Sequence, residues 1–215
     1  ELVYVARVFV DTSTIIKRAC IDRRLLLKAI MFSNRKIGAI AGLALALLTG
    51  HASAGDKDWI DSASVEYGTS SKLRMARVAV QKNWDAQWLA SNGRHLSGYW
   101  DLSAAYWRGD AYRNVQGDHQ NLAVVGFTPV LRYQRDDKLG WYAEAGIGAN
   151  LFSELYNNDG HQLSTAFQFG DHLGIGYVTP NKWDLGLKFR HYSNASIKRP
   201  NSGANFVAVS ARYDF

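Results

Sequence analysis

A histidine and a serine stand two residues apart near the end of the chain, in the stretch "WDLGLKFRHYSNASIKRPNSG". In an extended strand, residues i and i+2 share one face with their backbones about 6.5 Å apart, so the His191 imidazole can reach the Ser193 hydroxyl. Serine is a weak nucleophile until a base removes its proton, and histidine is the usual base near neutral pH. The pair therefore predicts nucleophilic ester hydrolysis. The alternative is a His and a Ser that only hydrogen-bond to their surroundings.

The residues before this pair alternate between apolar and polar side chains. Leu185, Leu187 and Phe189 have the same parity as His191 and Ser193. A period of two is typical of a β-strand with two different faces. The candidate chemistry thus lies on the apolar face of a strand, at its end.

The same alternation, interrupted by turn signals, predicts an all-β chain without long helices. Eight strands are expected, at residues 59–68, 72–84, 94–108, 120–135, 140–152, 164–178, 183–193 and 205–215.

Two closed barrels fit this pattern. A soluble lipocalin-like barrel would hold its apolar side chains inside, whereas a membrane barrel turns them towards lipid and keeps polar and small residues inside. Strands of about ten residues or more suit a tilted membrane span, and the chain ends on Phe215 in an aromatic strand typical of outer-membrane barrels. Tryptophans near strand ends resemble an interfacial girdle; they are Trp59, Trp84, Trp88, Trp107, Trp141 and Trp183. We predict an eight-stranded antiparallel transmembrane β-barrel of the outer-membrane type.

The start of the chain predicts export. From Met31 a short basic segment, an apolar stretch at residues 37–48 and the small-residue site Ala52-Ser53-Ala54 follow one another, as in a secretory signal peptide. We expect residues 1–30 to be an over-extended translation start, residues 31–54 to be the signal peptide and residues 55–215 to form the barrel.

Charge and residue types exclude several classes of function. Residues 1–54 carry eight basic and three acidic side chains, so residues 55–215 carry 17 basic and 16 acidic ones. The expected mature chain is therefore nearly neutral, and nucleic-acid binding is not expected. The single cysteine, Cys20, lies in the leader, so a disulfide framework is excluded. The histidines lack paired metal-ligand spacing and no nucleotide fingerprint occurs, so neither a metal nor a cofactor is implied. Inward parity predicts ion pairs in the lumen for Glu144, Lys188, Arg190 and Arg212.

Outer-membrane barrels have short periplasmic turns and long outer loops. With a periplasmic N-terminus, the connection at residues 194–204 is extracellular. His191 and Ser193 then face the outer leaflet, at the level of lipid headgroups and ester bonds.

Three segments resemble the lipid A 3-O-deacylases, the PagL family of outer-membrane enzymes. They are "LSGYWDLSAAYW" (96–107), "YAEAGIGANLFS" (142–153) and "FRHYSNASIKRPNSG" (189–203), within a likeness that covers about residues 60–215. The resemblance implies hydrolysis of the ester that holds the 3-hydroxyacyl chain at position 3 of lipid A, the anchor of lipopolysaccharide. It also implies that His191 is the general base, Ser193 the nucleophile and Asn194 an oxyanion donor, with Asn201 shaping the loop.

One position departs from the family pattern. The third triad residue is there a glutamate twelve residues after the serine, a position held here by Asn205. An asparagine can accept a hydrogen bond from the imidazole and fix its tautomer, but it cannot stabilise the imidazolium by charge. Asp171 is the rival, because its strand pairs with that of His191 and an outward carboxylate at membrane depth needs a partner.

Two other functions remain open at this stage. An outer-membrane phospholipase would use the same serine–histidine chemistry, and a structural or adhesin barrel would use neither residue. Whether two copies form a homodimer is also left open by the sequence.

Overall fold

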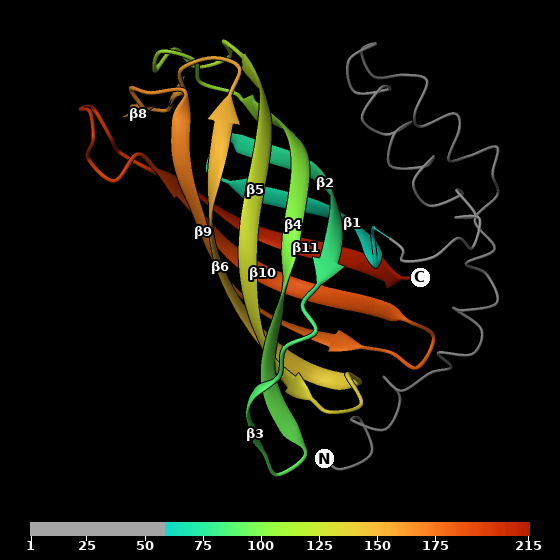
Figure 1. The fold of residues 1–215 in the computed structure, drawn as a ribbon. Helices are drawn as coiled ribbons and strands as arrows, with labels where there is room; N and C mark the ends of the chain where they lie inside the picture. The colour runs from blue at the N-terminus through green and yellow to red at the C-terminus, as the bar shows by residue number, and fades with distance from the viewer. Residues whose placement is uncertain (1–58) are drawn as a thin grey trace, which may run out of the picture. The chain divides into compact units, whose positions relative to one another are not determined.

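The structure, a computed structural model, describes residues 59–215. Eight long antiparallel strands follow one another along the chain (Figure 1). They are β1 (Ser62–Ser70), β2 (Leu73–Asn83), β4 (Arg94–Gly109), β5 (Gln120–Arg135), β6 (Gly140–Phe152), β9 (Phe167–Val178), β10 (Trp183–Ser193) and β11 (Ala204–Asp214). The eight predicted strands are confirmed, with ends shifted by at most three residues. The predicted signal peptide and the residues before it lie outside the described part of the chain.

The strands close into a barrel. Each long strand pairs with the next one along the chain, and β1 pairs with β11 to complete the ring. Three short strands were not predicted, namely β3 (Trp88–Ser91), β7 (Asn157–Asn158) and β8 (His161–Gln162), because segments of two to four residues carry no periodic signal. Among residues 59–215 there is no helix long and apolar enough to cross a membrane.

The two ends of the barrel differ in their connections. The long connections at residues 110–119, 153–166 and 194–203 share one end, which we call the loop end. The short connections at residues 136–139 and 179–182 lie at the opposite end, which we call the turn end, together with the longer segment 84–93 that contains β3. One two-residue turn, at residues 71–72, lies at the loop end. Short turns at one end and long loops at the other are typical of outer-membrane barrels.

The wall is apolar outside, and buried charged side chains lie on its inner face. Leu187 and Phe189 of β10 and Val209 of β11 are about half exposed. Charged side chains such as Glu144 and Arg190 are buried in the lumen. This is the pattern of a membrane barrel, and it rules out the lipocalin-like alternative.

The lumen has an apolar half at the loop end, which the sequence pattern did not predict. Trp107 lies at its centre, fully buried, with edge-to-face contacts to four aromatic rings. The aromatic plug, as we call this cluster, consists of Trp107, Phe152, Tyr156, Tyr192 and Phe206. An eight-stranded barrel is narrow enough for side chains to fill it, so no open channel remains here.

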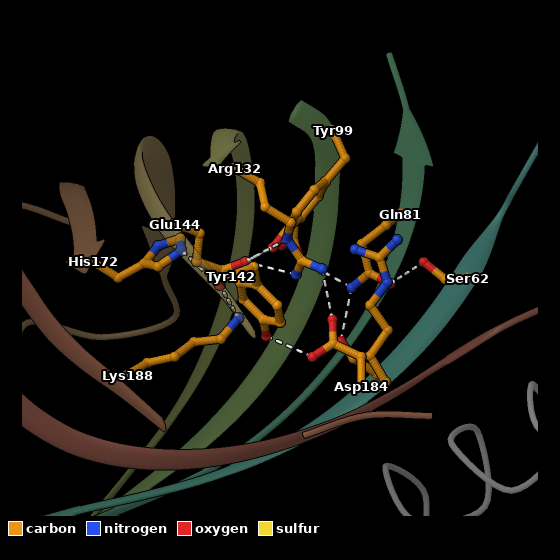
Figure 2. Close-up of polar contacts among 12 residues, drawn as sticks. Ser62, Gln81, Tyr99, Arg132, Tyr142, Glu144, His172, Asp184 and Lys188 are labelled. Atoms are coloured by element: carbon orange, nitrogen blue, oxygen red, sulfur yellow. Dashed lines mark hydrogen bonds and ion pairs between the residues drawn. The ribbon is translucent and has the colours of Figure 1, made fainter. Parts of the chain in front are cut away.

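The other half of the lumen holds an ion network, shown in Figure 2. Glu144 accepts from Arg132 and pairs with Lys188 at 2.6 Å, and Arg132 bridges Glu144 to Asp184. Arg190 pairs with Glu66 nearer the middle of the lumen. The predicted lumen ion pairs are thus confirmed, and Arg212 pairs with Asp214 towards the turn end.

Candidate active site

His191 and Ser193 lie where they were predicted, at the loop end of β10 on its outward face. Both are partly exposed, whereas Tyr192 between them is 3% exposed and belongs to the aromatic plug. The alternation of the strand therefore turns the ring of Tyr192 into the lumen and the side chains of His191 and Ser193 to the outside.

The register across three strands surrounds His191 with two candidate partners. His191 pairs with Asn205 on β11 and with Asp171 on β9. Its Nδ1 donates to Asn205 Oδ1 at 2.6 Å. A protonated Nδ1 leaves the lone pair on Nε2, the tautomer that a general base needs. The predicted outward position of Asn205 beside the pair is confirmed, and so is the pairing of Asp171 opposite His191.

The nucleophile candidate is not hydrogen-bonded. Within residues 59–215, Ser193 Oγ has no hydrogen-bond partner, and no bond joins it to His191. Catalytic hydrogen bonds are often long in the free enzyme and tighten when substrate is bound. Ser193 is partly exposed on the outward face of β10.

Gly203 packs directly against the imidazole of His191. It is buried with a φ of +72°, and a Cβ built on it would lie 2.7 Å from His191 Cε1. A side chain there would push the imidazole away, and the left-handed backbone itself favours glycine. The sequence motif contained this residue without revealing its role, because nothing in a sequence shows which side chain a loop glycine will touch.

Asn194 takes a different position from Ser193. Its side chain is fully buried and donates to Lys198 O at 2.8 Å and to Ser164 Oγ at 3.3 Å. Its backbone N–H donates to Asn201 Oδ1 at 2.9 Å, which gives Asn201 the loop-shaping role that the sequence suggested. Both amide hydrogens of Asn194 are therefore engaged within the loop in this arrangement.

The connection between β6 and β9 supports the connection that follows β10. The backbone N–H of Ser202 donates to Gln162 O, and Ser164 Oγ donates to Lys198 O. Leu163 forms a β-bridge with Asn201 and is buried. The connection after β10 is thereby clamped to the connection between β6 and β9, a contact that no sequence pattern predicted.

The plug reaches the site from the inside. Tyr192 lies between His191 and Ser193, and Phe206 follows Asn205. Trp107 contacts the rings of Tyr192 and Phe206 with centroid distances of 4.8 and 4.6 Å. Edge-to-face ring pairs have a preferred geometry, so these contacts hold two neighbouring strands in a fixed relation.

Across residues 59–215, no three His, Cys, Asp or Glu side chains gather in a way that could hold a metal.

The chain was compared with known families and proteins. The family model described as Lipid A 3-O-deacylase (PagL) matches residues 74–214, a range that includes His191, Ser193 and Asn205. The lipid A deacylase PagL of Bordetella bronchiseptica is 31% identical over 189 residues, which cover 85% of this chain and 97% of that protein. The lipid A deacylase PagL of Pseudomonas aeruginosa is 34% identical over 128 residues, covering 59% and 70% of the two chains.

A solved structure points to the same family. The crystal structure of the outer membrane enzyme PagL matches with a TM-score of 0.62 and 27% identity, over 72% of this chain and 99% of that one. The barrel is accordingly an outer-membrane barrel. This chain belongs to the lipid A 3-O-deacylase (PagL) family.

Proposed function

We propose that this protein is an outer-membrane esterase that hydrolyses the 3-O-linked 3-hydroxyacyl ester of lipid A by serine–histidine catalysis. Family membership supports lipid A as the substrate, since both relatives carry that activity in their names. The observation that carries the mechanism is the outward position of His191 and Ser193, with the imidazole held by Asn205. An ester at the membrane surface can reach this pair from the lipid phase.

The outer wall beneath the pair supports an acyl substrate. An open hollow of about 520 Å³ lies on the lipid-facing side of β1, β10 and β11. Its lining includes Val65, Tyr67, Leu185, Val209 and Ala211. Apolar surface of this kind suits the hydrocarbon chain while the ester stays at the level of Ser193.

The first chemical step forms an acyl–enzyme. His191 Nε2 takes the proton of Ser193 Oγ as that oxygen attacks the ester carbonyl carbon, and the carbonyl oxygen becomes an oxyanion. When the tetrahedral intermediate collapses, the bond to the sugar 3-oxygen breaks. The imidazolium returns its proton to that oxygen, so the deacylated lipid A leaves as an alcohol.

The second step regenerates the enzyme. His191 takes a proton from a water molecule, which attacks the acyl–Ser193 carbonyl. Collapse of the second intermediate releases the free 3-hydroxy fatty acid and returns the proton to Ser193 Oγ.

Asn205 acts in both steps as the residue that orients the base. Its carbonyl oxygen keeps the proton on His191 Nδ1 and leaves Nε2 free for the serine. Asp171 is paired in register with His191 from the other side and is the alternative source of this function. Only Asp171 could stabilise the imidazolium by charge, whereas only Asn205 makes the hydrogen bond.

The oxyanion needs a donor, and Asn194 is our candidate. Its weaker hydrogen bond, at 3.3 Å to Ser164 Oγ, is the one that the amide would exchange for the oxyanion. The bond to Lys198 O would then keep the side chain in place during the reaction.

The direct test is mass spectrometry of lipid A incubated with the purified protein and with its Ser193→Ala variant. We expect wild-type protein to release one 3-hydroxy fatty acid and the variant to release none. A parallel incubation with diacyl phospholipid separates the deacylase from a phospholipase. Loss of acyl chains from phospholipid alone, or no hydrolysis of either lipid, would contradict the proposal.

A further inference from the structure

A second group of charged side chains lies at the loop end, outside the catalytic site. The carboxylate of Asp110, just after β4, accepts from Arg74 of β2 and from Arg108 Nε of β4, the latter at 3.2 Å. His119 Nδ1 lies 3.1 Å from the same carboxylate. We call these four residues the rim arginine cluster.

The two arginines face the same side of the wall as the catalytic pair. Arg74 and Arg108 are paired in register, and in each strand their neighbours Met75 and Trp107 are fully buried, so both arginines have outward parity. Their side chains are 55% and 37% exposed. They therefore project from the outer surface of the barrel where the apolar wall ends.

The cluster lies within reach of a molecule bound at His191. The strands β11 and β1 lie between β10, which carries His191, and β2, which carries Arg74. Three strand spacings of about 4.8 Å make roughly 14 Å along the wall. That separation is comparable with the length of a disaccharide headgroup such as that of lipid A.

The cluster is held in place and keeps an excess of positive charge. The backbone N–H of Asp110 donates to Lys72 O, which fixes the carboxylate between the ends of β2 and β4. Burial opposes the charged form, but the hydrogen bonds from Arg74 and Arg108 outweigh it and hold the pKa of Asp110 below its usual range. The guanidiniums of Arg74 and Arg108 face a single carboxylate, so positive charge is in excess.

Several guanidinium N–H groups remain available for a ligand. Arg74 uses one Nη towards Asp110, and Arg108 uses its Nε. The remaining donors form a planar fork, the geometry that matches phosphate oxygens. The anionic groups of lipid A itself are its phosphates, at the same level of the membrane as the ester.

We propose that the rim arginine cluster binds a phosphate of the lipid A molecule whose ester is positioned at Ser193, and so orients the disaccharide across β11 and β1. The inference rests on the proposed function and adds a recognition site to it. The phosphate is the substrate's own rather than that of a neighbouring lipopolysaccharide.

The test compares two lipids and two proteins. Bisphosphorylated lipid A and the same lipid A without phosphates are given to the wild type and to the double variant Arg74→Gln/Arg108→Gln. Arg94→Gln, at the turn end, is the control for loss of an outer arginine. Each lost charge-assisted hydrogen bond is worth about tenfold, so we expect kcat/KM for the phosphorylated lipid to fall about 10- to 100-fold, mainly through KM.

The pattern of results decides the proposal. We expect the wild type to lose a similar factor when the phosphates are removed, and the double variant to treat both lipids alike. A double variant that kept the full preference for phosphorylated lipid would overturn the inference. A second outcome would also overturn it. If adding already deacylated, phosphorylated lipid A restored wild-type activity on the dephosphorylated lipid, the site would bind a neighbouring molecule and not the substrate.

A binding measurement separates this inference from the proposed function. Affinity for both lipids is measured in detergent on the Ser193→Ala background, where no turnover occurs. A phosphate-dependent affinity that disappears with the two arginines supports the site even if the deacylase activity fails. Equal affinity with and without the arginines contradicts the site even if deacylation is normal.

Discussion

The two halves of the barrel lumen are filled in opposite ways by the same eight strands. At the loop end, Trp107 and four further rings form an apolar plug. Towards the turn end, Arg132, Glu144 and Asp184 form a buried ion network. The outward catalytic candidates all lie over the plug, and none lies over the network.

The difference indicates what each half contributes. Ring contacts in the plug fix the strands that carry His191 and Asn205, because Tyr192 and Phe206 are their direct neighbours. Ion pairs in the network satisfy charges that cannot reach water, so removing one partner leaves the other buried and uncompensated. We therefore expect damage to the plug to affect turnover and stability together, and damage to the network to affect stability alone.

The largest effect on turnover is expected at the outward pair itself. His191→Ala and Ser193→Ala should each lower kcat by on the order of 10³-fold or more, since in the proposed mechanism the base and the nucleophile act together. The double variant should be no worse than either single one. Ser196→Ala, an exposed serine in the following loop, is the control. Near-normal release of 3-hydroxy fatty acid by Ser193→Ala would show that serine chemistry is wrong here.

The next effect concerns Asn205, the residue proposed to orient His191. Asn205→Leu should lower kcat about 100-fold, because the Nδ1 hydrogen bond at 2.6 Å is lost and the tautomer is no longer fixed. Asn205→Glu should retain or raise kcat by adding charge next to the imidazolium.

Asp171→Asn is the counter-test for that assignment. We expect a modest change in kcat, since the hydrogen bond of His191 goes to Asn205. A large loss with Asp171→Asn and none with Asn205→Leu would move the orienting role to β9.

The strands were predictable because their chemistry repeats every two residues over ten or more positions. The outward parity of Ser193 and Asn205 followed from that repeat, and the pairing of Asp171 with His191 followed from the short turn between their strands. Two lumen ion pairs were also predictable in kind, since Glu144 and Arg190 fall on the inward face.

The supporting contacts were not predictable, because they join residues without a common period. Trp107 reads as a girdle tryptophan in the sequence, but its odd parity in β4 turns it into the lumen, where it is fully buried. The clamp between Ser164 and Lys198 joins two irregular loops whose conformations depend on each other. Asn194 follows Ser193 directly, and its inward parity buries it, but its partners Ser164 and Lys198 lie in loops that carry no period.

A smaller effect is expected where the loop touches the imidazole. Gly203→Ala should lower kcat about tenfold with little change in KM, because the added Cβ would displace His191. Gly93→Ala is a matched control, since Gly93 has a φ of +71° and nothing within 4 Å of its Cβ position. Equal losses in the two variants would mean that backbone strain, and not contact with the imidazole, is responsible.

Trp107→Ala tests the plug half of the comparison. Loss of a buried tryptophan typically costs about 3 kcal/mol, and here it also removes the ring that contacts both Tyr192 and Phe206. We expect a lower unfolding midpoint in urea and a severalfold decrease in kcat, measured on protein folded into lipid vesicles.

Glu144→Gln tests the network half and should have the smallest effect on turnover. The change leaves Arg132 and Lys188 without their shared carboxylate, which costs about 3 kcal/mol in a buried site, close to the cost of Trp107→Ala. Because the rings of Tyr192 and Phe206, which flank His191 and Asn205, keep their contacts with Trp107, kcat below the unfolding transition should stay within about twofold of wild type. Equal loss of stability with unequal loss of turnover would separate the two halves. A decrease in kcat as large as that of Trp107→Ala would mean that the whole lumen, and not the plug, holds the site in position.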